Sequence, residues 1–155
     1  MASSFFQIEK LLIDRIKELF PNECEIVTYF NFEPEALKEN ITGRKPTFYL
    51  WYVGYDSGDG VGYERAKIIK QTWAIALIIH HYQYKQTMPY RMQEPDKYVD
   101  KLLDGLVGWD FTTQSADCKH GELKLVNAGL SAINTKEVSI LPFAFETSYV
   151  LERLN

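Results

Sequence analysis

Two strand-length segments of this chain are apolar on both faces, and this constrains the fold more than any other feature of the sequence. Successive side chains of a β-strand point to opposite faces of the sheet. The first segment divides into two apolar sets, namely Phe48, Leu50 and Tyr52 on one face and Tyr49, Trp51 and Val53 on the other. The second divides in the same way into Trp73, Ile75, Leu77 and Ile79 against Ala74, Ala76 and Ile78. A strand with one wet face alternates apolar and polar residues, so both segments are predicted to lie in a sheet that is covered on both faces.

The rest of the chain supplies two helices and three further strands. The first helix is predicted to start at a Ser4 cap that forms a capping box with Gln7, and to end near Phe20. The second is predicted to have Pro95 at its first position and Gly108 at its C-cap. Segments rich in β-branched and aromatic residues predict five strands in all, at residues 25–32, 47–55, 66–82, 122–127 and 136–151.

The order of these elements favours an α+β fold, because several strands follow one another without intervening helices. We expect a mainly antiparallel or mixed sheet of about five strands with two helices packed on one face. The length of 155 residues suits one domain that spans residues 1–155. Pro142 lies inside the last predicted strand, which indicates an edge position or a bulge there.

Two helices of about 21–25 Å each cover one face of such a sheet but not both. The second face therefore needs another cover, either the long loops of the same chain or a neighbouring copy. Aromatic residues make up 14% of the chain and are enriched at interface cores, so we expect self-association. Trp51 and Trp73 are the candidate interface residues on the two apolar strands.

Composition and charge exclude several function classes. The formal net charge is −4 and no basic run is present, which argues against nonspecific DNA binding. The loop at residues 82–91 mixes aromatic and basic side chains as single-strand-binding surfaces do, but it holds only two cations. No apolar run approaches the roughly 20 residues that a bilayer span needs, and the N-terminal residues lack a signal-peptide pattern. We expect a soluble protein.

A glycine-rich stretch separates two of the predicted strands. Gly58, Gly60 and Gly62 form G-x-G-x-G, whereas a dinucleotide fingerprint is G-x-G-x-x-G and opens a helix. Asp56 and Asp59 lack the bidentate Glu that completes a calcium loop. The stretch is predicted to be a hairpin loop, which can also serve as an acidic contact with a partner surface.

Histidine and cysteine residues form no recognisable metal or catalytic pattern. His80 and His81 are adjacent on a strand, so they point to opposite faces and cannot share a metal ion. His120 with Cys118 or Ser115 is an alternative catalytic pair, but no motif marks it. We therefore predict no catalytic residue, no metal ligand and no cofactor.

Three carboxylates follow one side of the second predicted helix. Asp96, Asp100 and Asp104 stand at positions i, i+4 and i+8, where like charges are mildly destabilising. We call this set the acidic ridge. Together with Asp56 and Asp59 it supplies the candidate residues for an interface or for the wall of a lumen.

Several strings of the sequence resemble one known protein family. They are the opening IEKLLIDRIKELFP, the strand FYLWYVGY before the glycine-rich loop, and then QTWAIALIIHH, LLDGLVGW and ILPFAFET. In this order they resemble the Mu-like tail terminator, or tail completion, proteins of long-tailed bacteriophages and prophages. The resemblance extends over nearly the whole chain.

The resemblance implies a structural role in the virion rather than catalysis. Proteins of this group form a ring, typically a hexamer, that caps the head-proximal end of the tail tube, ends its polymerisation and docks to the neck. It implies assembly in the bacterial host cytoplasm, with itself, the tail tube protein and a neck or connector protein as partners, and DNA passing through the lumen. A head–tail connector subunit is the alternative, and a small enzyme or ligand-binding domain is a further one.

Overall fold

The computed structural model describes residues 6–29, 46–57, 66–80, 93–111, 120–134 and 138–152. They form two helices and six strands. These are α1 (Gln7–Leu19), β1 (Glu25–Tyr29), β2 (Thr47–Ser57), β3 (Ala66–His80), α4 (Gln93–Leu106), β4 (Lys124–Val126), β5 (Ile133–Asn134) and β6 (Val138–Glu152). The predicted α+β class is confirmed. The parts of the predicted strands at residues 30–32, 81–82 and 136–137 lie outside the described residues.

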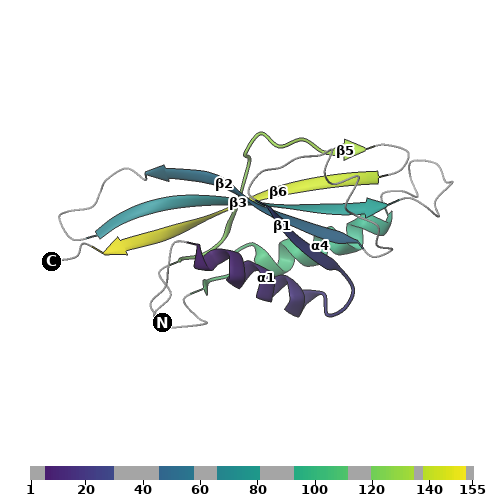
Figure 1. Cartoon of the computed structure of the whole chain (residues 1–155), viewed down its shortest axis with the longest axis horizontal. Coiled ribbons are helices and arrows are strands. Elements are labelled where there is room, and N and C mark those ends of the chain that lie inside the picture. The colour runs from purple at the N-terminus through teal and green to yellow at the C-terminus, as the bar shows by residue number, and fades with distance from the viewer. Residues whose placement is uncertain are drawn as a thin grey trace.

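The strands form one mixed sheet in the order β1-β2-β3-β6-β4, and the two-residue β5 also pairs with β6. β1 runs parallel to β2, while every other pairing is antiparallel. Both helices lie on the same side of this sheet and β5 lies on the other (Figure 1). The five predicted strands are therefore all present. β5 was missed, because two residues are too few to show a period in the sequence.

The first helix begins later than its sequence signal predicts. The N-cap is Phe6, which makes no side-chain cap hydrogen bond, whereas Ser4 of the predicted capping box lies outside the described residues. The Phe6 ring instead packs edge-on against Tyr52, with ring centroids 5.5 Å apart, and against Trp73. Aromatic packing on the sheet, a tertiary contact, therefore anchors the start of α1.

The second helix also departs from its predicted start. α4 begins at Gln93, so Pro95 is its third residue and not its first. Proline is accepted there because the first turn of a helix has no intrahelical partner for its N–H groups. The predicted C-cap is confirmed, since Gly108 has a φ of +81° and donates its N–H to Leu123 O.

The main core lies between the two helices and the sheet. One apolar side of each helix packs on the first face of β2 and β3, as predicted. The helices approach closely at Gly105, where an added Cβ would lie 2.5 Å from Leu19 Cδ1. Arg15 Nε donates to Gly105 O at 3.1 Å, and the Arg15 guanidinium lies 4.8 Å from the centre of the Trp109 ring. A glycine that weakens α4 locally thus permits its packing on α1.

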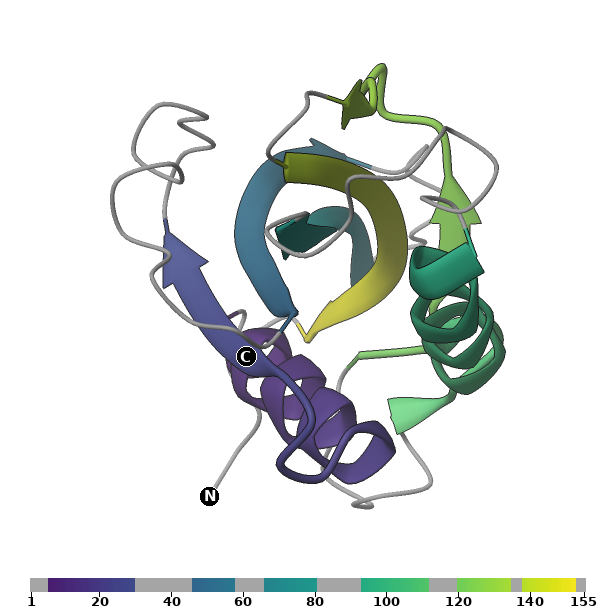
Figure 2. The same cartoon turned by 90° about the vertical axis from the view of Figure 1, so that its right-hand side faces the viewer.

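The second face of the sheet is covered by the chain itself. Tyr49, Trp51 and their neighbours on β3 are buried within a single copy, with Leu130 and Ile133 from the β4–β5 region packed against them. Seen along the strands, the long β2, β3 and β6 curl strongly and β5 lies above them (Figure 2). A second copy is not needed to hide this face, so the expectation of self-association loses its structural argument.

Candidate functional site

The two candidate tryptophans lie on opposite faces of the sheet. Trp51 is 5% exposed and belongs to the second-face cluster, whereas Trp73 is 3% exposed and belongs to the main core. The Trp73 ring packs against Tyr52 at 5.3 Å. The prediction that these residues form an interface conflicts with their burial, because a buried side chain offers no surface to a partner.

The acidic ridge lies in solvent on α4, as its spacing predicts. Asp96, Asp100 and Asp104 are all exposed. Lys97 and Lys101 each directly follow an aspartate of the ridge in the sequence. Lys101 Nζ lies 4.0 Å from Glu23 Oε1 and 5.1 Å from the centre of the Phe20 ring. This lysine is drawn toward the end of α1, which leaves the three carboxylates on the open side of the helix.

The other candidate residues are only partly covered by the structure. Asp56 is exposed near the end of β2 and stands opposite Lys70 on β3. Asp59 and the glycines of its loop lie outside the described residues, as do Ser115 and Cys118. Asp56 lies on β2 and the acidic ridge lies on α4, while the loop at residues 82–91 also falls outside the described residues.

His120 lies in a buried polar cluster that the sequence did not predict. Its side chain is fully buried, its Nε2 lies 3.2 Å from Gln71 Oε1, and its ring packs against Tyr149 at 4.9 Å. Thr147 Oγ1 donates to Gly121 O at 3.0 Å in the same region. These contacts attach the segment before β4 to the sheet, so His120 holds structure together and offers no surface for catalysis. Gln71 and Thr147 pair with each other across β3 and β6, but their neighbours in the sequence are polar too, so no sequence signal marks this cluster.

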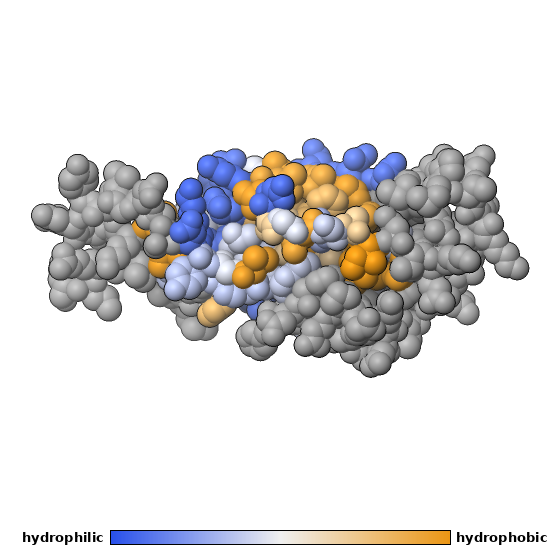
Figure 3. All heavy atoms as spheres, turned by 90° about the horizontal axis from the view of Figure 1, so that it is seen from above, coloured by the Kyte–Doolittle hydropathy of each residue, from blue (hydrophilic) through white to orange (hydrophobic). Residues whose placement is uncertain are grey.

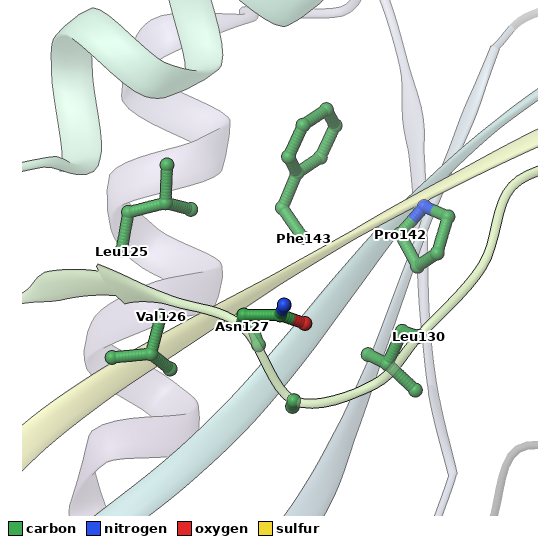
Figure 4. A pocket seen from close by; sticks show the side chains of 8 residues that line it. Leu125, Val126, Asn127, Leu130, Pro142 and Phe143 are labelled. Carbon is green, nitrogen blue, oxygen red and sulfur yellow. The ribbon is translucent and has the colours of Figure 1, made fainter.

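An open apolar notch of about 380 Å³ lies where β4 leaves β6. Leu125 and Phe143 point to one side of the sheet there, and Val126 points to the other (Figure 4). Leu130 and Pro142 line its far end. Sequence reasoning missed this notch, because its walls come from segments that the chain brings together only in the folded state.

Chemical machinery is not evident in the described part of the chain. Among those residues no three His, Cys, Asp or Glu side chains lie close enough to share a metal ion. Neither α1 nor α4 has the length and apolar character that a bilayer-crossing helix requires. The features that the structure presents are surfaces: an acidic helix side and an apolar notch.

Comparison with known proteins gives these surfaces a context. A family model described as phage tail terminator protein matches residues 1–155, which is the entire sequence. No curated protein matched the chain. The family is one of phage structural proteins. The chain therefore belongs to the phage tail terminator family.

Proposed function

We propose that this protein forms a ring, a hexamer by resemblance, that caps the head-proximal end of the tail tube of a long-tailed phage or prophage. The ring ends polymerisation of the tube and gives the neck a docking surface. The single observation that carries the proposal is the family match over the whole chain. The narrower Mu-like assignment and assembly in the host cytoplasm remain predictions.

Particles made without the protein test this function directly. If it ends tube growth, electron micrographs will show overlong tails that lack heads, because nothing stops addition of tube subunits. Tails of normal length beside unattached heads would contradict termination and indicate the head–tail connector role instead. The control is restoration of tail length when the wild-type protein is supplied in trans.

The acidic ridge is the proposed wall of the lumen. DNA carries closely spaced phosphates, so exposed carboxylates facing its path would keep it from adhering to the ring. Such a role accounts for keeping Asp96, Asp100 and Asp104 on one side of α4 despite their mutual repulsion.

Charge reversal tests the lumen proposal. Asp100→Lys combined with Asp104→Lys is expected to slow DNA ejection from otherwise normal particles, because the new cations bind passing phosphates. A matched control, Asp14→Lys with Glu18→Lys, makes the same change in net charge at two exposed positions that are also four residues apart, but on α1. Equal ejection rates for both double variants would contradict a ridge that faces the DNA.

A further inference from the structure

The residues that line the apolar notch carry no charge. They come from residues 125–130 and 142–144 and include no Asp, Glu, Lys or Arg, although such residues make up 25% of the chain. Seen from above, apolar residues gather between hydrophilic ones on the described part of the molecule (Figure 3). Depletion of charge marks the core of a protein–protein interface.

The notch is built by the local structure of the chain. β4 pairs with β6 up to Ala144 and β5 pairs with β6 from Ile140, so the residues of β6 between them have no neighbouring strand on that side in the described residues. Asn127 Oδ1 accepts the Gly129 N–H at 3.0 Å, and Gly129 has a φ of +73°. This turn swings the chain away from β6 and holds the notch open.

An exposed apolar side chain that could occupy this notch lies elsewhere on the same chain. Tyr55 on β2 is 70% exposed, the highest value among the large apolar side chains that the structure describes. It directly follows a bulge that interrupts the pairing of β2 with β3. β2 and β4 are separated in the sheet by β3 and β6, so Tyr55 and the notch are different surfaces of one molecule.

Charge accompanies both surfaces with opposite signs. The exposed Asp56 follows Tyr55 in the sequence, and the exposed Lys124 precedes Leu125, which lines the notch. Within one copy, Asp56 pairs with Lys70 on the neighbouring strand β3, and Lys124 pairs with Glu146 on the neighbouring strand β6. Each surface therefore also holds a compensating charge. An ion pair between Asp56 of one copy and Lys124 of the next would therefore affect the alignment of the two copies and the choice of partner more than the affinity.

We propose that Tyr55 of one copy inserts into the notch at Leu125 of the next copy, with Asp56 beside the neighbour's Lys124. The inference rests on the proposed ring function and names the contact that builds the ring. Two different surfaces that fit each other make a head-to-tail contact, and such contacts close into rings when the rotation between copies permits it.

Two single variants and their mixture test the contact in solution. Leu125→Asp blocks the notch and Tyr55→Ala removes the inserted side chain, and each is expected to weaken self-association at least about tenfold by sedimentation. Mixed together, they are expected to form a dimer and nothing larger, because one variant keeps a notch and the other keeps its tyrosine. Val107→Asp is the matched control, since Val107 and Leu125 are both 46% exposed.

If the ring forms only on tails, crosslinking in assembled particles tests the proposed contact between Tyr55 and the notch. Copies with Tyr55→Cys and Leu125→Cys are expected to give a ladder of oxidised oligomers, and copies with only one of the changes are not. A ring without the ladder, or variants that assemble like the wild type, would overturn the contact but leave the ring function standing. Normal self-association with failed tail completion in Leu125→Asp would also overturn it, by assigning the notch to a different tail protein. Normal tail length without the protein is the separate result that overturns the proposed function.

Discussion

Tyr52 is a residue whose ionisation the fold changes. Its ring packs against Phe6 and Trp73 at the edge of the main core. Burial raises the pKa of Tyr52 above its ordinary value of 10.0, and the neighbouring Tyr55 phenol adds to the rise. The sequence places Tyr52 on an apolar face but gives no sign of this effect, because the groups that desolvate it come from α1 and β3.

This raised pKa predicts a loss of stability at alkaline pH. The unfolded chain loses the Tyr52 proton first, so the folded state holds more protons above about pH 10 and stability falls as pH rises. Urea unfolding at about pH 8 and about pH 10.5 measures the fall. Tyr52→Phe is expected to show a smaller fall than the wild type. An equal fall in both proteins would show that Tyr52 is not responsible.

The bulge in β2 is the local feature that shapes this strand. Tyr52 pairs with Trp73 and Gly54 pairs with Thr72, so Val53 is the extra residue. The alternation of residues 48–52 predicted the two apolar faces correctly, but Val53 was assigned to the second face and is exposed instead. A period of two cannot show where one residue drops out of register.

Deleting Val53 is expected to be tolerated. The pairs on both sides of the bulge keep their partners when the extra residue is removed, so the free energy of unfolding should change by no more than about 1 kcal/mol. Deleting Leu50 from the regular part of β2 shifts the pairing and moves the following side chains to the opposite face, so that variant should not fold. Circular dichroism with urea titration distinguishes the two. Equal loss of structure in both would contradict the bulge assignment.

A single copy buries both faces of its sheet, and this decides the character of the whole molecule. The helices cover the first face, and the β4–β5 region, with residues such as Leu130, covers the second. Each copy therefore has a complete sheet core of its own. In the proposed ring, contacts between copies would use surfaces that stay exposed, such as the notch and Tyr55.

Tryptophan fluorescence tests this view of the subunit. The chain has three tryptophans, and Trp109→Phe leaves only the buried Trp51 and Trp73. We expect blue-shifted emission and weak acrylamide quenching at concentrations where the protein is monomeric, with little change on assembly. Strong quenching of the monomer that disappears on assembly would instead show that copies shelter these rings from one another.

The sequence by itself determined the two helices, all the described strands except β5, the fold class and the two apolar faces of the central strands. These follow from local spacing, since the positions of apolar residues along a helix or strand fix which side is buried. The helix ends show the limit, because the local pattern did not predict that α1 starts after Phe6 or that the Phe6 ring packs on Tyr52. The resemblance to tail terminators also came from short strings, and the family match confirms the family.

Only the tertiary structure decided what covers the second face, where His120 lies and that a notch exists beside Leu125. Each depends on segments far apart in the chain that meet in the folded molecule, as Gln71 and His120 do. The number of predicted helices did not decide whether the same chain or a second copy covers the second face. The uncharged stretch near Leu130 has no helical or strand periodicity that would reveal its role as a cover. Hydrophobic pattern tells which side of a strand is buried, but not which part of the molecule buries it.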